Sequence, residues 1–561
     1  MSAKKIVIGT IGVWLLLLAL LIALEVRSER IAYEQEKSTG LGTVAQRSGL
    51  LDLFRGQPSV ERQSANLAAV PEHSVGAGYA GEFNTEEYGV ISESGLLNVE
   101  TSPLSTFSID VDTAAYSNVR RFLADGTLPP AGAVRLEELI NYFNYRYPQP
   151  EGQHPFSVTT EMARNPWQPE RYLVRIGLQS RPIPLSEAPP SSLVFLIDVS
   201  GSMNSPNKLP LLKGALRLLI DQLRPEDRVS IVVYAGSAGL VLPSTAGSNQ
   251  AAIRAALDLL QAGGSTAGGA GIQLAYKIAR ENFLESGNNR VILATDGDFN
   301  VGVSSDSEMV KLIERERESG VFLSVLGFGG GNLKDSKMEK IADHGNGAYA
   351  YIDTELEARK VLVEEVGATL VTVAKDVKLQ VEFNPVMVQA YRLIGYENRL
   401  IADEDFDDDK KDAGELGAGH SVTALYEVTT AAADSGQPGA DTLEYQNRVR
   451  TPKAHSSGEV LTVKVRYKRP EESESQLLSR TLKFRDAELA AASDDFRFAA
   501  AVAEFGMLLR DSHYKGQASY DQVLKLAEGA GTAQSDDSRF EFLHLVRTAR
   551  RLSSGSVASA L

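Results

Sequence analysis

Apolar and polar positions follow one regular pattern between residues 192 and 370. Short continuous apolar runs, typical of strands buried on both faces of a parallel sheet, alternate with amphipathic helical stretches. This repetition predicts a doubly wound α/β sheet with helices on both faces. The predicted strands are Leu193–Ile197, Val229–Tyr234, Gly239–Leu242 (at an edge), Val291–Thr295, Val321–Gly327 and Ala348–Ile352. The helices between them are predicted at residues 209–223, 250–261, 271–283, 305–318, 335–342 and 355–366.

The segments on either side of this region have a different pattern, in which apolar and polar residues alternate. Such alternation indicates half-exposed antiparallel strands. We expect the doubly wound domain to be inserted into a β-rich platform whose strands come from both flanks, followed by C-terminal helices near Phe498–Leu509 and Phe542–Val546. Specifically, Phe156–Met162 and Tyr172–Leu178 are predicted to pair with Val377–Phe383 and Leu461–Tyr467.

The N-terminal segment contains nineteen consecutive uncharged residues, Ile6–Leu24. As a helix they would span about 28 Å, close to the thickness of the hydrocarbon core of a membrane. The stretch is longer than the core of a usual signal peptide, so an uncleaved single-pass anchor is predicted, with a cleaved signal peptide as the alternative. Lys4 and Lys5 favour an N-terminus inside, which would place the bulk of the chain in the periplasm or otherwise outside the cytoplasmic membrane.

Together these patterns divide the chain into five predicted parts. A membrane anchor covers residues 1–30 and a flexible linker covers residues 31–95, which lack sustained periodicity. An N-terminal domain (96–190), the doubly wound domain (191–370) and a β-rich and helical C-terminal domain (371–561) complete the chain.

Composition excludes several classes of function. The chain has 57 Lys and Arg against 73 Asp and Glu, a net charge of −16, which argues against nucleic-acid binding because phosphates need clustered cations. It has no cysteine, so disulfides, thiolate zinc sites, iron–sulfur clusters and a lipid-modified cysteine are all excluded. Any chemistry must therefore use carboxylates, hydroxyls, histidines and the backbone.

Oxygen-bearing side chains gather where three predicted loops reach the carboxyl edge of the sheet. Asp198, Ser200 and Ser202 follow the first buried strand, and Asp296 follows another. A Gly-rich turn, Gly263-Gly264-Ser265-Thr266, offers further hydroxyls. Ligands of doubly wound sheets bind at this edge, and hard oxygen ligands suit Mg²⁺ or Mn²⁺ rather than zinc. The sequence therefore predicts a metal site with room for an outside ligand.

These motifs resemble the metal-ion-dependent adhesion site of von Willebrand factor type A (VWA) domains. The resemblance rests on Asp198-x-Ser200-x-Ser202, then Thr266, then Asp296 within Thr-Asp-Gly. It implies that Asp198, Ser200 and Ser202 bind the metal, that Thr266 joins directly or through water, and that Asp296 usually acts through the other ligands. Ser265 is an alternative to Thr266.

A second stretch, Pro103 to Leu123, resembles the N-terminal domain of YfbK-type bacterial proteins, in which a C-terminal domain of unknown role follows the VWA domain. That resemblance implies an envelope protein without enzymatic activity. We expect a cation-dependent protein-binding module that uses Mg²⁺ (or Mn²⁺ or Ca²⁺) to bind an acidic side chain of a protein partner. The oligomeric state is left open. The alternatives are a Mg²⁺-dependent phosphohydrolase with Asp198 as nucleophile and a structural scaffold with a vestigial metal site.

Two other acidic motifs are interpreted as structural. Asp110 and Asp112 resemble a phosphoryl-accepting motif, but no partner lysine is apparent, so a polar turn at the end of a strand is expected. The run Asp403–Asp412 lacks the glycine and the final glutamate of an EF-hand, which favours a solvated acidic loop.

Overall fold

The computed structural model describes residues 85–264, 269–297, 306–365, 371–411, 413–431, 450–531 and 537–558. These residues belong to one compact unit, Gly81–Leu561, and only this unit is considered below. The predicted anchor Ile6–Leu24, the linker up to residue 84 and the candidate ligand Thr266 lie outside the described residues. Among the helices that are described, none has both the length and the apolar composition that crossing a membrane requires.

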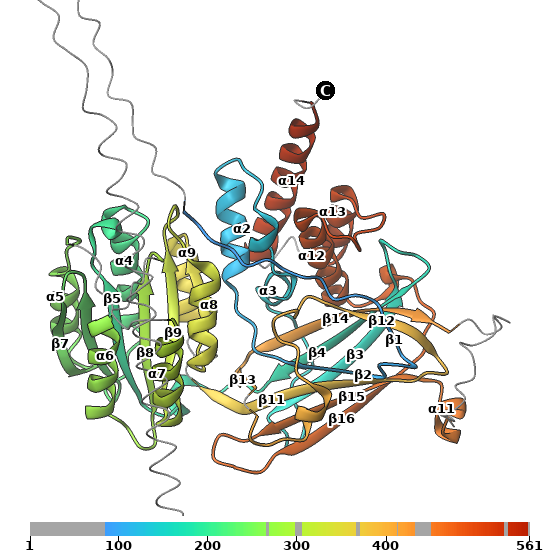
Figure 1. Cartoon of the computed structure of the whole chain (residues 1–561), viewed down its shortest axis with the longest axis horizontal. Coiled ribbons are helices and arrows are strands. Elements are labelled where there is room, and N and C mark those ends of the chain that lie inside the picture. The colour runs from blue at the N-terminus through green and yellow to red at the C-terminus, as the bar shows by residue number, and fades with distance from the viewer. Residues whose placement is uncertain are drawn as a thin grey trace, which may run out of the picture. The chain divides into compact units, whose positions relative to one another are not determined.

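The doubly wound domain has the predicted sheet (Figure 1), and each of its strands overlaps one of the predicted strands, with β7 extending well beyond its predicted end. The order of the strands is β10-β9-β8-β5-β6-β7. All neighbours are parallel except β6 and β7, which pair antiparallel at the edge. The strands are β5 (Ser191–Asp198), β6 (Arg228–Tyr234), β7 (Ala238–Ala246), β8 (Asn288–Thr295), β9 (Val321–Phe328) and β10 (Tyr349–Ile352).

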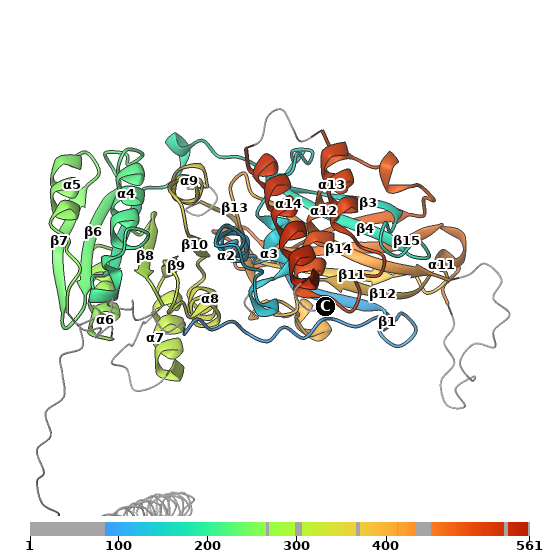
Figure 2. The ribbon, with the colours of Figure 1, turned by 90° about the horizontal axis from the view of Figure 1, so that it is seen from above.

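Helices cover both faces of this sheet, as Figure 2 shows. One face packs against α4 (Leu209–Ile220), α5 (Gln250–Asp258) and α9 (Glu355–Arg359), which continues into a π turn, Lys360–Glu364. The other face packs against α6 (Gly269–Glu281), α7 (Asp306–Glu318) and α8 (Asp335–His344). The sheet is therefore buried on both sides, which is why its strands have continuous apolar runs.

The remaining strands form two antiparallel sheets that share one hydrophobic core. The first sheet has the order β1-β12-β14-β4-β3, and the second has the order β13-β11-β15-β16 with β2 paired to β11. Strands of the first sheet are β1 (Leu97–Asn98), β3 (Phe156–Arg164), β4 (Tyr172–Ser180), β12 (Val388–Ile394) and β14 (Ser421–Thr430). Strands of the second are β2 (Leu104–Ser108), β11 (Thr372–Phe383), β13 (Gly414–Gly417), β15 (Glu459–Lys468) and β16 (Gln476–Lys483).

Each of the two sheets combines strands that precede the doubly wound domain in the chain with strands that follow it. The sequence of the doubly wound domain is therefore inserted within the sequence of the platform. The predicted partners were nevertheless wrong. β4 pairs with β14, and β11 pairs with β2, whereas β3 pairs with β4 alone. Alternation shows which face of a strand is buried but carries little information about its partner.

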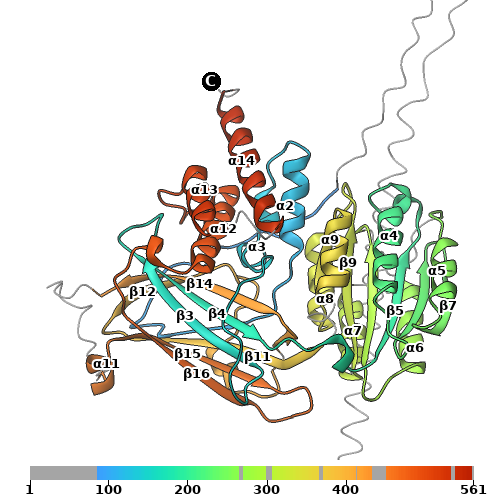
Figure 3. The ribbon, with the colours of Figure 1, turned by 180° about the vertical axis from the view of Figure 1, so that it is seen from behind.

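Helices cover the outer face of the first sheet (Figure 3). Because this sheet lies between the second sheet and the helices, every residue of β4 is buried. The helices of this layer are α2 (Ala114–Ala124), α3 (Leu136–Asn141), α12 (Asp494–Arg510), α13 (Tyr520–Gly529) and α14 (Asp537–Ala558). Shorter helical elements are α11 (Pro452–Ser456) and the 3₁₀ turns 131–133, 185–187, 201–204, 403–406 and 489–491.

Candidate metal site at the sheet edge

Two carboxylates lie at the point where the winding of the sheet reverses. From β5 the chain winds outward to β6 and β7, and it then returns to β8 and winds the other way. Asp198 is the last residue of β5, and Asp296 directly follows β8, the strand beside it. Both residues are fully buried. This is the place in a doubly wound sheet where ligands bind, and the chain puts its two predicted acidic residues there.

The loop after β5 folds back on Asp198. Oδ1 of Asp198 accepts the backbone N–H of Ser200 at 2.8 Å, and the hydroxyls of Ser200 and Ser202 lie 3.0 Å apart. A short 3₁₀ turn, Gly201–Asn204, sets this spacing. The hydroxyl of Thr295 lies 3.4 Å from Oδ2 of Asp198, so both oxygens of the carboxylate are held in place. The structure thus brings together the carboxylate and the two hydroxyls that the sequence singled out.

The loop that leads to Thr266 begins against the same site. The N–H of Gly201 donates to the carbonyl of Gly264 at 3.1 Å, and the N–H of Gly263 donates to the carbonyl of Val199 at 2.8 Å. Gly264 has a φ of +89°, a conformation that suits glycine. Thr266 itself lies outside the described residues, so its place as a ligand stays a prediction.

Burial raises the pKa of Asp198 to about 6, even though hydrogen bonds from Ser200 favour the charged form. The nearby charge of Asp296 raises it further. Two carboxylates at one buried place repel each other, and this repulsion is relieved when a cation binds between them.

Lys208, which sequence analysis did not single out, supplies one positive charge at the site. Its Nζ lies 3.0 Å from Oδ2 of Asp296 and 3.3 Å from Oδ1 of Asn332. The aliphatic part of Lys208 packs against Gly329, where a Cβ would lie 2.2 Å from Cε of the lysine. Nothing in the local pattern marks Lys208, because a lysine just before a helix is ordinary; only the fold brings it to Asp296.

The residues present fit a divalent cation. Oδ1 of Asp296 is buried and has no hydrogen-bond partner in the described part of the chain, although Oδ2 of the same carboxylate is paired with Lys208. A buried carboxylate oxygen without a partner is costly unless something positive binds it. Two carboxylates and two hydroxyls are the hard oxygen donors that Mg²⁺ and Mn²⁺ prefer. Asp198, Ser200, Ser202 and Asp296 are therefore suited to hold such an ion, with Lys208 beside them.

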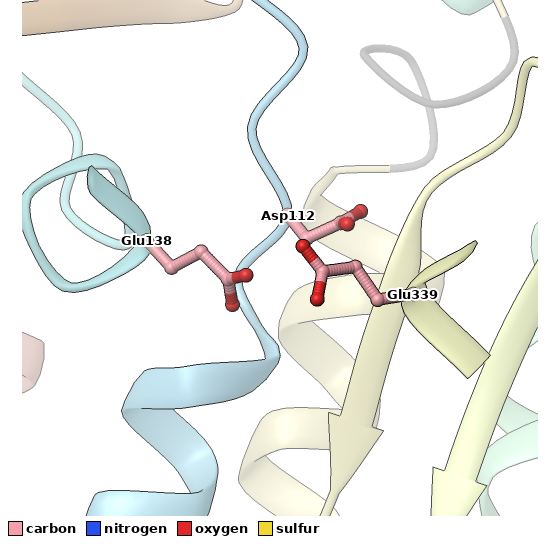
Figure 4. A group of neighbouring side chains, drawn as sticks. All are labelled: Asp112, Glu138 and Glu339. Atoms are coloured by element: carbon pink, nitrogen blue, oxygen red, sulfur yellow. The ribbon is translucent and has the colours of Figure 1, made fainter. Parts of the chain in front are cut away.

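A second group of carboxylates, Asp112, Glu138 and Glu339, also converges (Figure 4). Their oxygens lie within 4.8 Å of one another. Two arginines already neutralise this group: Arg399 lies 3.1 Å from Asp112 and 3.6 Å from Glu339, and Arg135 pairs with Glu138. Arginine stays protonated in proteins, so both guanidinium charges remain beside these carboxylates and would repel a metal ion. This cluster is therefore a buried ion-pair network rather than a metal site.

The same network includes Asp112, which follows strand β2, as the sequence analysis predicted for a polar residue after a strand. Its side chain is buried. Its Oδ1 accepts the backbone N–H of Tyr349 at 2.6 Å, and burial raises its pKa well above the ordinary value. The carboxylate thus joins the N-terminal flank to β10 of the doubly wound domain.

Comparisons with protein families assign most of the described chain. Residues 192–365 match the model of the von Willebrand factor type A domain. Residues 368–552 match the model described as the C-terminal region of the uncharacterized protein YfbK, and residues 82–175 match a model described as von Willebrand factor. The VWA match contains strands β6 to β10, all of β5 except its first residue, and the candidate metal site.

Individual relatives agree with these matches. The chain is 44% identical over 473 residues to the uncharacterized protein YfbK of Escherichia coli (strain K12), covering 83% of this chain and 81% of that protein. It is 30% identical over 195 residues to the inter-alpha-trypsin inhibitor heavy chain H3 of Bos taurus, covering 33% of this chain and 22% of that protein. Among solved structures, a von Willebrand factor type A protein from Catenulispora acidiphila is 16% identical with a TM-score of 0.41, covering 72% of this chain and 91% of that one.

Proposed function

The chain belongs to the YfbK family and carries a VWA domain, and from this premise we propose that it is a divalent-cation-dependent protein-binding module. The proposed cation is Mg²⁺, with Mn²⁺ or Ca²⁺ as alternatives. Its proposed protein ligands are Asp198, Ser200 and Ser202, with Asp296 beside them and Thr266 on the adjacent loop.

One observation carries this proposal. Asp296 is fully buried next to Asp198, and its Oδ1 has no partner among the described residues. With Lys208 counted, the two carboxylates leave a net formal charge of −1 in a buried site. A divalent cation would bind the orphaned oxygen and change the net formal charge of the site to +1, which favours an acidic side chain of a partner.

The residues of the site have separable tasks in this proposal. β5 and β8 hold the two carboxylates rigidly at adjacent strand ends, and the hydrogen bond from Ser200 fixes the orientation of Asp198. The hydroxyls of Ser200 and Ser202 supply neutral oxygens, so the site does not collect excess negative charge. When bound, the cation offers a coordination position that an acidic side chain of a protein partner can fill. Affinity for that partner then depends on the cation.

The site gives little support to catalysis. A phosphohydrolase would need a second acidic residue two positions after Asp198, where Ser200 stands, and Asp198 is held through both oxygens. We therefore propose a binding function without turnover.

A metal titration of the full chain tests this proposal. Calorimetry should show one Mg²⁺ or Mn²⁺ bound by the wild type and none at the same concentrations by Asp198→Asn. The matched control is Asp221→Asn, which changes an exposed aspartate of the same domain. Equal binding by the wild type and Asp198→Asn would refute the site. Absence of binding by the wild type at millimolar Mg²⁺ would favour a scaffold with a vestigial site.

We also propose that Ile6–Leu24 anchors the chain in the cytoplasmic membrane with its bulk outside the cytoplasm. Support comes from the sequence alone, through the length of the uncharged stretch and the lysines before it. Protease added to intact spheroplasts should degrade the VWA domain. Full protection of that domain in spheroplasts whose outer proteins are digested would contradict this orientation.

A further inference from the structure

A cavity of about 740 Å³ lies where the doubly wound domain meets the platform. Its wall from the doubly wound domain includes residues of β5, β8 and β9 and none of the candidate metal ligands. Its opposite wall includes the ends of platform strands, such as Gln179 of β4 and Thr372 of β11. Arg290 on this wall comes six residues before Asp296 along β8, a distance of about 20 Å at ~3.3 Å per residue. The cavity is thus separate from the candidate metal site.

Arg290 is a buried cation on the wall of this cavity that has no close ion pair in the described part of the chain, although the nearby charge of Glu415 favours its charged form. Arg290 is only 3% exposed, and its Nη1 donates a hydrogen bond to the hydroxyl of Ser324 at 2.7 Å. Nε has no hydrogen-bond partner, and no ion pair is formed by this guanidinium in the described part of the chain. Burying an arginine in this way costs several kcal/mol unless an anion compensates it, and here a cavity adjoins it.

Four other carboxylates that line the cavity are paired with cations: Asp110 and Asp112 with Arg399, Glu364 with Arg359, and Glu365 with Lys360. Glu415 accepts hydrogen bonds from Thr372 at 2.8 Å and from Asn346 at 3.4 Å. Lys360 donates to the carbonyl of Tyr142 at 2.6 Å. Burial lowers the pKa of His420 to about 4, so this residue is neutral at physiological pH. Arg290 is therefore the cation on this wall that is best placed to bind an anion from solution.

The rest of the wall from the doubly wound domain is apolar. Leucine and isoleucine side chains from three strands and one helix line the same cavity as Arg290, and all are buried: Leu193, Leu219, Ile292 and Leu326. An anion that filled this space would gain from burying a hydrocarbon portion as well as from pairing with the guanidinium. The guanidinium fork, with Nε and Nη2 available, matches the two oxygens of a carboxylate.

We propose that this cavity is a binding site for a small amphiphilic carboxylate, with Arg290 holding the carboxylate and the apolar wall holding an aliphatic chain. The site is independent of the proposed metal site, so either can fail without the other. Because the cavity is lined by both the doubly wound domain and the platform, an occupant would contact both.

Octanoate and octanol, used as probes on the full chain, test this proposal. The wild type should bind one octanoate at least tenfold more tightly than octanol, because only octanoate pairs with Arg290. Arg290→Met should bind octanoate no more tightly than octanol, and Arg290→Lys should recover only part of the preference, because lysine lacks the fork. The control is Arg228→Met, which removes an exposed arginine at the start of strand β6 in the same sheet.

Folding of the variants does not limit the test, because the comparison of octanoate with octanol on the wild type stands alone. Equal affinity of the wild type for the two probes, or no binding of either, would overturn the proposal. So would unchanged octanoate binding by a folded Arg290→Met. If acetate bound as tightly as octanoate, the apolar wall would contribute nothing to binding. That result would overturn the proposal that the wall holds an aliphatic chain.

Discussion

Replacing Lys208 by methionine removes the positive charge that pairs with Asp296 in the described part of the chain. The two charged atoms are 3.0 Å apart, so their direct Coulomb attraction at an effective dielectric constant of 20 is about 5.5 kcal/mol. Desolvation offsets part of that, and breaking one side of a buried pair typically costs about 3–5 kcal/mol. Methionine keeps the aliphatic packing against Gly329, so the change isolates the charge. We expect Lys208→Met to unfold about 6–20 °C below the wild type in a chelator, for a domain of this size.

Scanning calorimetry of the full chain, with chelator and with 10 mM Mg²⁺, measures this effect. Mg²⁺ should raise the melting temperature of Lys208→Met more than that of the wild type, because the ion then becomes the main counter-charge of Asp296. Lys277→Met, at an exposed position on α6, is the control and should behave as the wild type. If Lys208→Met melted with the wild type in chelator, the pair would contribute nothing. If Mg²⁺ raised both melting temperatures equally, Lys208 and the cation would not share Asp296.

Three further predictions concern other parts of the chain. Gly329→Ala should lower the free energy of unfolding by about 1–3 kcal/mol, because the new Cβ would clash with Lys208 and the backbone φ of residue 329 is +68°. Urea denaturation measures this change, and an unchanged midpoint of the urea transition would contradict it. Burial raises the pKa of Glu504 from 4.5 to about 8, so the native state holds a proton that the unfolded state has lost, and stability falls as pH rises. Between pH 6 and 9 the free energy of unfolding of the wild type should fall by about 3 kcal/mol more than that of Glu504→Gln. Equal falls for the two proteins would refute this prediction. Arg399→Met removes the ion pair of Asp112 and one of those of Glu339, so it should cost about 3–5 kcal/mol and speed amide exchange in α8. Exchange equal to that of the wild type would count against the network.

The doubly wound domain was predictable because its strands carry their own signal. A strand such as Leu193–Ile197, buried on both faces, must be apolar throughout, and helical stripes between such runs leave few alternatives. The platform was less predictable. β14 is ten residues long and pairs with β4, yet it is missing from the predicted strand pairs, because a strand between a sheet and a helical layer shows no clean alternation.

The candidate metal site was also predictable only in part. Asp198, Ser200 and Ser202 are close in sequence, and Asp296 ends a strand that must lie beside β5, so their meeting follows from the fold class. Lys208 lies 88 residues from Asp296 and marks no motif. Its role depends on the close approach of Gly329, which depends in turn on how loops after different strands pack. The contacts of Asp112 with Tyr349 and Arg399 could not be predicted from the sequence either, since they join segments more than 200 residues apart.

The location of the cation tests the central claim most directly. Crystals of the protein grown with Mn²⁺ and measured at the manganese absorption edge would show where the ion lies. The account predicts one anomalous peak between the carboxylates of Asp198 and Asp296, near the hydroxyls of Ser200 and Ser202. A peak among Asp112, Glu138 and Glu339, or no peak at the ends of β5 and β8, would contradict it.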